Sequence, residues 1–510
     1  MIGKTRDLFL FTTKFEMSIW PAIYLLKKEK RWNMTAKSTI PFVNREKEVE
    51  LIQSKLEAFQ EQKRVFDFIL AVSGIPGIGK TTLLGKAQEE AHIRGIPSIQ
   101  IDYEHPLVKN NPIYLLQHVA EQSFKSLTSW KEVLQDYQEH EGHPVQPAYY
   151  QERLIDTFVV NFKVQLEQAP LLLLIDNSHY MSELAKEILE DVLERVYSQN
   201  RLLIILAGRA DIRWSSFELR RRTRSITLTP FPKTENAKLV PDPSYLMLTD
   251  QVYNLTRGYP KASVLAYQWV ADHLEPSEVS LVDHFKAHEA ELVFDLFDSI
   301  FVEYILHNIE APETRQRLSK LLRYVSPLRR FDHNLLSELL RKLNKEHQFN
   351  QIDALTAHNY IRQMAALTYL VKWDSARQAY ALDTPMRQLL SLEMKFRDRP
   401  QLLQIHQFVV DWYLRAINVV TNKDPSTPQS VVYLIEYIYH FAQLWHLEDK
   451  SGSLEVEVRQ KIADLFKGYY MRERVHFQEE FNKDEDLVEL LGDAYNRLIE
   501  FVARQVELEG

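Results

Sequence analysis

The stretch Gly74-Ile75-Pro76-Gly77-Ile78-Gly79-Lys80-Thr81-Thr82 decides the fold of this chain. It contains three of the 13 glycines and places a lysine and two threonines directly behind them. This is the G-x-x-x-x-G-K-[ST] pattern of a phosphate-binding loop. An apolar, β-branched run at 65–72 precedes the loop and a helical pattern at 81–94 follows it, so the strand, loop and helix that the motif requires are all predicted. The alternative, a glycine-rich turn that binds nothing, would not require Lys-Thr-Thr at these places.

The spacing suits a nucleoside triphosphate with Mg²⁺. Glycines lack a Cβ atom and let backbone N–H groups converge on the β-phosphate, at the positive end of the following helix. We expect Lys80 to reach the β- and γ-phosphates, Thr81 to hold Mg²⁺ and Thr82 to meet the α-phosphate. The predicted binding residues of the loop are Gly74, Ile75, Pro76, Gly77, Ile78, Gly79, Lys80, Thr81 and Thr82.

Two further apolar runs end in charged residues. The run at 170–177 (PLLLLIDN) is typical of a central parallel strand, and its Asp176 is expected to present a carboxylate to Mg²⁺, as in the Walker B pattern. The run at 202–207 leads to Arg209, which is expected to face the γ-phosphate. The alternatives are a turn aspartate at the end of a core strand and an arginine in a surface salt bridge.

Five strands alternating with helices predict a three-layer α/β sandwich. The two strands that complete the set are predicted at 98–101 and 226–228.

With 510 residues the chain is too long for one core. A net charge of -8 does not favour nucleic acid, the absence of cysteine excludes disulfides and thiol catalysis, and the scattered histidines predict no protein-ligated transition metal.

The first 33 residues differ from the rest. The apolar run at 8–26 is interrupted by Lys14, Glu16 and Pro21 and lacks the cleavage site of a secretory signal. The alternatives are a membrane anchor and an ill-ordered extension, with Met34 as a possible natural start. We favour the extension and expect a cytoplasmic protein without membrane contact.

The order of the motifs resembles the STAND branch of the AAA-related P-loop NTPases, which includes NB-ARC and NACHT proteins. The resemblance covers roughly residues 40–395. The segments that carry it are Phe42-Val43-Asn44-Arg45-Glu46-Lys47-Glu48, GIPGIGKTT, LLLLIDNSHY, ILAGR, Ile226-Thr-Leu-Thr-Pro-Phe231 and Gly258-Tyr259-Pro260.

The resemblance implies roles for residues outside the loop. Val43 and Arg45 match the segment that lies against adenine and ribose, and Pro260 matches a lid proline that packs on the base. Asn177 stands where the family often has an acidic residue that orients the attacking water. Because an amide is a poorer base, we expect slow hydrolysis. His179 is a candidate to take over part of the role of this acidic residue, and the alternative is that it caps the next helix.

Three helical patterns and a hairpin predict a winged helix between 313 and 390. In the family a short motif near the hairpin contacts ADP, but Leu382 stands where a histidine is common. The predicted recognition helix, 351–367, has one Arg and one Asp, so it lacks a basic footprint for DNA. We therefore expect the domain to close over ADP and to swing out with ATP.

The last hundred or so residues predict helices at 401–420, 431–445, 454–470 and 487–506. Five aromatic residues in the second of these helices require burial by neighbours or by a protein partner. The predicted domains are an N-terminal extension (1–39), a P-loop NTPase core (40–232), a helical lid (233–311), a winged helix (312–395) and a helical C-terminal domain (396–510).

These observations predict an ATP-binding switch with weak ATPase activity that uses ATP, ADP and Mg²⁺. The predicted catalytic residues are Lys80, Asp176, Asn177 and Arg209, with Thr81 and Asp176 as Mg²⁺ ligands. Nucleotide-dependent homo-oligomers and a protein partner at the C-terminal helices are expected. Two alternatives remain, namely an initiator-like AAA regulator that binds DNA through its winged helix and a scaffold that does not hydrolyse nucleotide.

Overall fold

The computed structural model describes residues 42–61, 63, 65–140, 147–274, 281–307, 309–343, 352–375, 378–423 and 428–507. The predicted extension at 1–39, and with it the choice between an anchor and an ill-ordered segment, lies outside the described residues. In the part of the chain that is described, no helix combines the length and the apolar character needed to cross a membrane.

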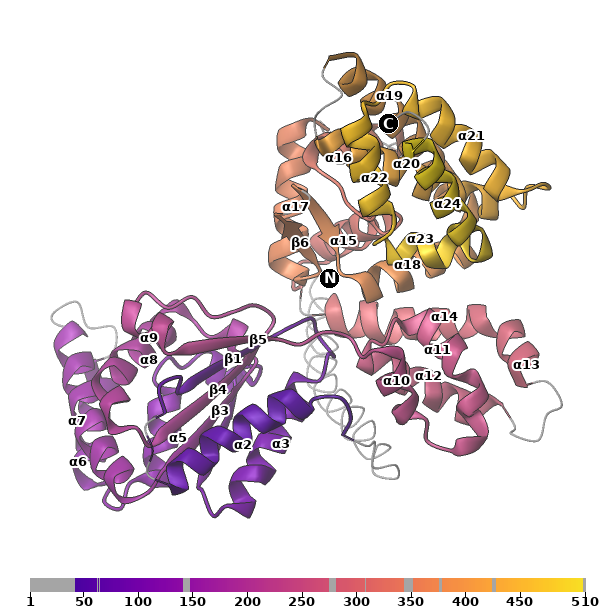
Figure 1. The fold of residues 1–510 in the computed structure, drawn as a ribbon. Helices are drawn as coiled ribbons and strands as arrows, with labels where there is room; N and C mark the ends of the chain where they lie inside the picture. Colours follow the sequence, from indigo (N-terminus) through magenta and orange to yellow (C-terminus); the bar gives the residue numbers. More distant parts are fainter. Residues whose placement is uncertain are drawn as a thin grey trace, which may run out of the picture.

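Five parallel strands form the central sheet in the order β2-β3-β4-β1-β5 (Figure 1). They are β1 (Ile69–Ser73), β2 (Ser98–Asp102), β3 (Leu171–Asp176), β4 (Leu202–Gly208) and β5 (Thr223–Thr227). Every residue of β1, β3 and β4 is buried, because helices cover the sheet on both faces. These helices are α2 (Glu46–Gln60), α3 (Lys80–Ile93), α4 (Pro106–Lys109), α5 (Tyr114–Ser123), α6 (Thr128–His140), α7 (Pro147–Gln168), α8 (Glu183–Val196) and α9 (Phe217–Arg221). The predicted three-layer α/β sandwich is confirmed.

Strand boundaries differ from the prediction where the apolar signal is weak. The strand β5 lies at the edge of the sheet and spans 223–227, so it overlaps the predicted 226–228 but begins earlier. None of its five residues is fully buried, so its sequence lacks the apolar run that reveals a central strand. The strand β1 begins only at Ile69, because the preceding predicted positions form a loop.

Short helices follow the sheet and form what we call the lid helices. They are α10 (Lys233–Asn236), α11 (Thr249–Thr256), α12 (Pro260–His273), α13 (Leu281–Ala287), α14 (Glu289–Leu296) and the π-helix η6 (Phe297–Ile305). A π-helix of nine residues is rare, and such segments often occur at functional sites. Here it lies beside the phosphate loop.

The predicted winged helix is present. It consists of α15 (Pro312–Val325), α16 (His333–Leu343), α17 (Ala354–Thr368) and the antiparallel hairpin of β6 (Val371–Asp374) and β7 (Ala379–Leu382). A bridge between Phe331 and Tyr380 adds a third segment to the hairpin. The helix α18 (Thr384–Arg397) follows, and we call α15 to α18 the winged-helix region.

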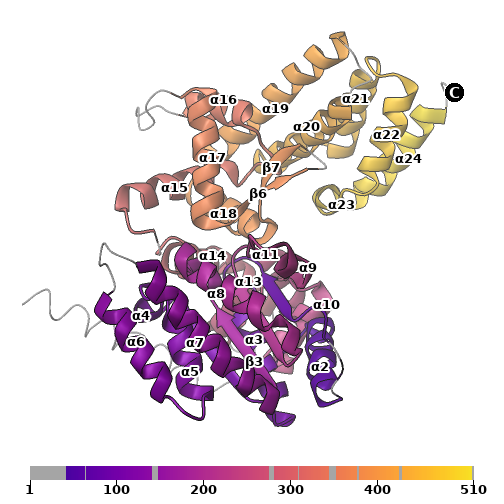
Figure 2. The same cartoon turned by 90° about the vertical axis from the view of Figure 1, so that its left-hand side faces the viewer.

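The C-terminal helices pack beside this region (Figure 2). They are α19 (Arg399–Lys423), α20 (Pro428–Leu447), α21 (Leu454–Phe466), α22 (Met471–Phe481), α23 (Glu485–Leu491) and α24 (Asp493–Glu507). The predicted helix at 487–506 is divided at Gly492, whose positive φ of 53° ends α23. The helix α22 was not predicted.

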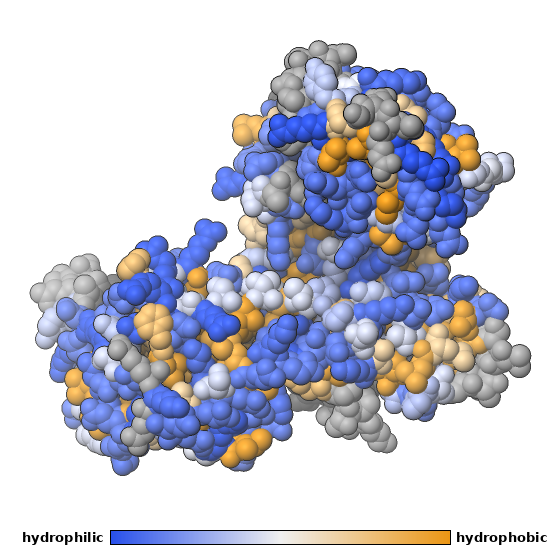
Figure 3. Space-filling view, viewed as in Figure 1, coloured by the Kyte–Doolittle hydropathy of each residue, from blue (hydrophilic) through white to orange (hydrophobic). Residues whose placement is uncertain are grey.

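The aromatic helix α20 is largely covered by the chain itself. Tyr437 and Tyr439 are buried among neighbouring helices. The face in Figure 3 is mostly hydrophilic over the C-terminal helices, with apolar side chains only in small groups. The sequence left open whether neighbouring helices or a protein partner bury the aromatic residues. For Tyr437 and Tyr439 the neighbouring helices do so.

Candidate nucleotide-binding site

The backbone of the loop between β1 and α3 has the conformation that the motif requires. Gly77 and Gly79 have φ values of 78° and 102°, which side chains with a Cβ atom rarely adopt. Gly79 directly precedes α3, so the N–H groups of the first turn of that helix face the loop. The loop is therefore shaped to hold an anion at the N-terminus of α3.

Lys80 lies inside the loop. Its ammonium group donates hydrogen bonds to the carbonyl oxygens of Gly74 at 2.8 Å and Ile75 at 3.0 Å. Burial, together with the nearby positive charges of Arg209 and Lys372, lowers the pKa of Lys80 to about 8. The loop thus holds a poorly solvated ammonium group that a phosphate would stabilise as a cation.

The two predicted magnesium ligands meet across the site. The Thr81 hydroxyl group donates a hydrogen bond of 2.6 Å to Oδ2 of Asp176, which joins the start of α3 to the end of β3. Burial raises the pKa of Asp176, although the bonds from Thr81 and from the backbone of Asn177 oppose this. Hydroxyl and carboxylate oxygens are ligands that Mg²⁺ accepts alongside phosphate and water, so these residues fit the ion.

Asn177 is held by an aspartate that the sequence analysis missed. Its side-chain amide donates a hydrogen bond of 2.9 Å to Oδ1 of Asp102, and its backbone has a left-handed φ of 53°. Asp102 ends β2 directly beside Asp176 at the end of β3. The signal was available in the sequence, since both carboxylates follow apolar strand residues.

Arg209 and His179 lie together at the ends of β3 and β4. The guanidinium group of Arg209 is 5.9 Å from the ring centres of both Tyr180 and Tyr369, and the imidazole ring of His179 packs edge-on to Tyr369. Burial and the neighbouring cations lower the pKa of His179 to about 3, so its ring is neutral. His179 does not cap the following helix α8, because Ser182 does.

The residues predicted to face the base come from two segments outside the loop. Arg45 donates hydrogen bonds to the carbonyl oxygens of Thr229 at 2.7 Å and Ile78 at 3.3 Å, and its guanidinium group lies 5.0 Å from the ring centre of Phe231. Pro260 is buried at the start of α12, and Val43 is partly buried. The structure thus brings Arg45 to the loop, and the contacts of all three with adenine or ribose stay a prediction.

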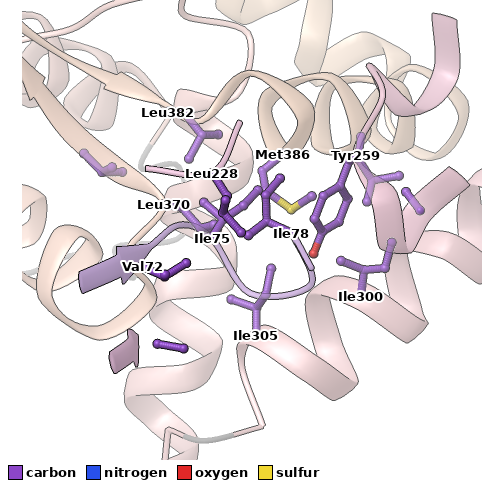
Figure 4. Close-up of a cluster of buried hydrophobic side chains, with 14 of the residues drawn as sticks. Val72, Ile75, Ile78, Leu228, Tyr259, Ile300, Ile305, Leu370, Leu382 and Met386 are labelled. Atoms are coloured by element: carbon purple, nitrogen blue, oxygen red, sulfur yellow. The ribbon is translucent and has the colours of Figure 1, made fainter. Parts of the chain in front are cut away.

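The loop is covered by two regions that lie far from it in sequence. The hydroxyl group of Tyr259, from the lid helices, donates a hydrogen bond to the carbonyl oxygen of Pro76. Figure 4 shows the loop side chains Ile75 and Ile78 in one buried apolar cluster with residues of the lid helices and of the winged-helix region. The labelled members from these two regions are Tyr259, Ile300, Ile305, Leu370, Leu382 and Met386.

Comparison with known proteins classifies one segment in the first half of the chain. Residues 67–214 match a family model described as an AAA domain. This segment, which contains the loop, Asp176 and Arg209, is an AAA-type P-loop NTPase domain. The match supports the AAA part of the resemblance seen in the sequence, and its STAND part stays a prediction.

Solved structures give distant likenesses. The ORC2 protein of Aeropyrum pernix, in ADPNP and ADP complexes, has a TM-score of 0.41 at 16% identity, over 71% of this chain and 96% of that chain. CDC6P of Pyrobaculum aerophilum has a TM-score of 0.35 at 12% identity, over 71% of this chain and 96% of that chain. DnaA of Aquifex aeolicus with AMPPCP has a TM-score of 0.29 at 15% identity, over 61% of this chain and 85% of that chain. Values this low carry no functional assignment, and no curated protein matches the chain.

Proposed function

We propose that this chain is an ATP-binding switch in which the lid helices and the winged-helix region cover the phosphate loop, and in which ATP with Mg²⁺ displaces them. The observation that supports the proposal is the burial of Ile75 and Ile78, two variable positions of the motif, against both regions. A loop that only bound phosphate would not require apolar side chains there. In this arrangement the cover itself contacts the nucleotide site.

The two nucleotides would act on this cover differently. A γ-phosphate would draw Lys80 from the loop carbonyls and bring negative charge beside the apolar side chains of Leu382 and Met386. Burying charge against apolar groups is costly, so the triphosphate would favour the open arrangement. ADP, which lacks that phosphate, would tolerate the closed one. Such a difference in affinity is what a nucleotide switch requires.

Slow hydrolysis belongs to the same proposal. Asp176 and Thr81 would hold Mg²⁺ and Arg209 would stabilise charge on the γ-phosphate, but Asn177 supplies no carboxylate to orient the attacking water. The STAND-type role in signalling, nucleotide-dependent self-association and a protein partner at the C-terminal helices are the finer parts of this proposal.

The chain suits a direct test, because it contains no cysteine and two introduced thiols would label specifically. One dye is placed on α3 through Glu89→Cys and the other on α17 through Asn359→Cys, both exposed positions. Energy transfer between the dyes should fall with Mg-ATP, recover with Mg-ADP and stay unchanged in the Lys80→Ala variant. Transfer that is identical with the two nucleotides, under conditions where calorimetry shows that both bind, would exclude the switch.

A second candidate function is DNA binding through the winged-helix region, and charge supports it. Residues 312–397 carry 15 Lys and Arg against eight Asp and Glu, in a chain whose net charge is -8. Arg341, Lys342 and Arg362 are exposed. Against this, α17 itself carries only Arg362 as a charged residue, and three of the other arginines, Arg329, Arg330 and Arg387, pair with C-terminal carboxylates.

Gel shifts with duplex DNA decide this candidate. Binding should weaken by more than tenfold between about 50 and 200 mM salt, and the double variant Arg341→Ala/Arg362→Ala should reduce both the affinity and the salt dependence. The matched control is Arg472→Ala/Arg504→Ala, which removes two exposed arginines from the C-terminal helices. Absence of a shift with Mg-ATP at the lower salt concentration would remove the candidate.

A further inference from the structure

A cavity of about 550 Å³ lies between the winged-helix region and the C-terminal helices. Its walls include Arg330 to Asp332 from the segment before α16, Gln378 and Ala379 of the hairpin, and residues of α19, α20 and α22. Small-molecule sites have volumes of roughly 300 to 1,000 Å³. The residues around this cavity all lie between 330 and 484, so the site is distinct from the phosphate loop.

One side of the cavity is aromatic. Phe331, Trp412, Tyr413 and Tyr433 line it, and the rings of Trp412 and Tyr433 stand nearly perpendicular, with centres 5.9 Å apart. The ring of Tyr413 lies 5.7 Å from that of Tyr433. Aromatic faces at this spacing accept the face or the edge of a further ring. The lining therefore suits a ligand with a flat ring.

Arg330 gives the cavity a buried cation whose hydrogen bonding is incomplete. The residue is 8% exposed, and its Nε atom lies 2.8 Å from Oε1 of Glu436. Glu436 also pairs with Arg329 at 3.0 Å, so two guanidinium groups share one carboxylate. Within the described part of the chain, neither Nε nor Nη1 of Arg330 has a hydrogen-bond partner, so the contact with Glu436 is an ion pair only. A buried donor without an acceptor is costly, and a ligand oxygen would satisfy it once the guanidinium group turns toward the cavity.

The carboxylates on the wall are already engaged. Asp332 accepts a hydrogen bond from the backbone N–H of Leu335 at the start of α16, Asp484 accepts two from Arg329, and Glu480 lies 3.4 Å from the ammonium group of Lys483. None of the three accepts a hydrogen bond from Nη1 of Arg330. Arg330 therefore lacks a hydrogen-bond acceptor in the lining of the cavity.

We propose that this cavity binds a small ring-bearing oxyanion, a carboxylate or a phosphate, with its charged group on Arg330 and its ring on the aromatic wall. The ligand would contact the winged-helix region and the C-terminal helices together. It would therefore stabilise their contact, whether or not the phosphate loop acts as proposed above.

Calorimetry on the full chain tests the site with phenyl phosphate and indole-3-acetate as probes, and with phenol and tryptophol as their uncharged counterparts. For probes of this size we expect a dissociation constant on the order of a millimolar for at least one oxyanion. It should bind at least tenfold more tightly than its uncharged counterpart. Comparison of phenyl phosphate with indole-3-acetate shows whether the site prefers a phosphate or a carboxylate group.

Two variants locate the binding. Arg330→Met removes the donor while keeping an unbranched apolar stem, and Gln429→Trp fills the cavity from an exposed position, so it does not depend on a buried change. Each should weaken probe binding by about tenfold or more. The control Arg415→Met, on the exposed surface of α19, and the loop variant Lys80→Ala should bind as the wild type does.

Three results would overturn the proposal. The first is a wild-type chain that binds neither oxyanion at millimolar concentration. The second is unchanged binding in Gln429→Trp. The third is binding that disappears in Lys80→Ala, which would place the probe in the phosphate loop.

Discussion

The hydroxyl group of Tyr259 donates a hydrogen bond to the carbonyl oxygen of Pro76, so the lid helices contact the phosphate loop at its backbone. Tyr259 is completely buried. A Cβ atom on Gly77 would lie 2.4 Å from this hydroxyl group, which no side chain could tolerate without a shift. The glycine is therefore required by the lid contact as well as by the shape of the loop.

Tyr259→Phe should speed nucleotide exchange. The variant keeps the ring in its packed position and removes one buried hydrogen bond, worth about 1 kcal/mol, from the closed arrangement. We therefore expect dissociation of a fluorescent ADP analogue to be about fivefold faster in stopped-flow measurements. The matched control is Tyr245→Phe, which loses a buried hydrogen bond to the carbonyl oxygen of Leu274 within the lid helices. Equal rates in both variants would contradict the role of the Tyr259 contact.

Lys80 predicts proton uptake on ATP binding. Its pKa is about 8 without nucleotide, so a fraction of Lys80 is neutral at pH 8 and must gain a proton to bind phosphate as a cation. Below about pH 7 Lys80 is already protonated and uptake should vanish, and above pH 8 ATP affinity should fall as pH rises. Calorimetry at pH 8 in buffers of different ionisation enthalpy measures the uptake. Lys80→Arg, which stays protonated, should show none.

Lys80→Ala should weaken ATP binding by about ten- to a hundredfold, because it removes a charged donor worth about 1.5 to 3 kcal/mol. Titration with a fluorescent ATP analogue measures the loss. The control Lys86→Ala removes a partly exposed lysine further along α3, which pairs with Glu89 and Glu90 and not with the loop. Unchanged affinity in Lys80→Ala would refute the assignment of the loop.

The hydrogen bond between Asn177 and Asp102 predicts how the rate of ATP hydrolysis could be raised. Asn177→Asp alone would set two carboxylates about 3 Å apart, and like charges at that distance keep one of them protonated. The double variant Asn177→Asp/Asp102→Asn exchanges the two groups and retains the hydrogen bond. We expect the double variant to release phosphate at least tenfold faster than the wild type, because it supplies a carboxylate base. Asp176→Ala gives the background rate to subtract, and a double variant no faster than the wild type would contradict the prediction.

Asp486 of α23 should stabilise the contact between the winged-helix region and the C-terminal helices. It pairs with Arg387 at 2.8 Å. Burial raises the pKa of Asp486, but the charges of Arg387 and Arg329 outweigh it and leave the pKa below its usual value. Asp486→Ala leaves a buried guanidinium group without its partner and should lower the free energy of unfolding by about 1 to 3 kcal/mol.

The sign of the pH effect follows from the lowered pKa of Asp486. The stabilisation is complete above the unfolded-state pKa of about 3.9 and is lost as the pH falls through the lower folded-state value. Denaturant titrations at pH 7 and at about pH 3 should therefore show a smaller difference between wild type and variant in acid. Asp464→Ala, which breaks an exposed pair with Lys467, should change the stability much less than Asp486→Ala does. A pH-independent effect of Asp486→Ala would mean that packing, not charge, is responsible.

Local patterns predicted much of the fold and of the site. The apolar runs around Leu173 and Ile204 identified buried strands, and the hairpin and three helices identified the winged helix. The same patterns failed where the signal was weak, at the edge strand β5 and at Gly492, where a turn divides a continuous helical periodicity. Asp102 ends a strand as Asp176 does, but only the parallel pairing of β2 with β3 shows that it lies beside Asp176 and can hold Asn177, 75 residues away.

By itself, the sequence determined the phosphate loop, since its glycines, lysine and threonines act over a few neighbouring residues. It also placed Asp176 at the end of a strand, because the run of aliphatic residues that marks a buried strand stops there. Only the tertiary structure decided what covers Ile75 and Ile78, because Leu382 and Met386 come from elements some three hundred residues away and no local pattern records which apolar surfaces will meet. The same holds for Tyr259 on Pro76 and for the cavity beside Arg330, which exist only where separate helices pack together.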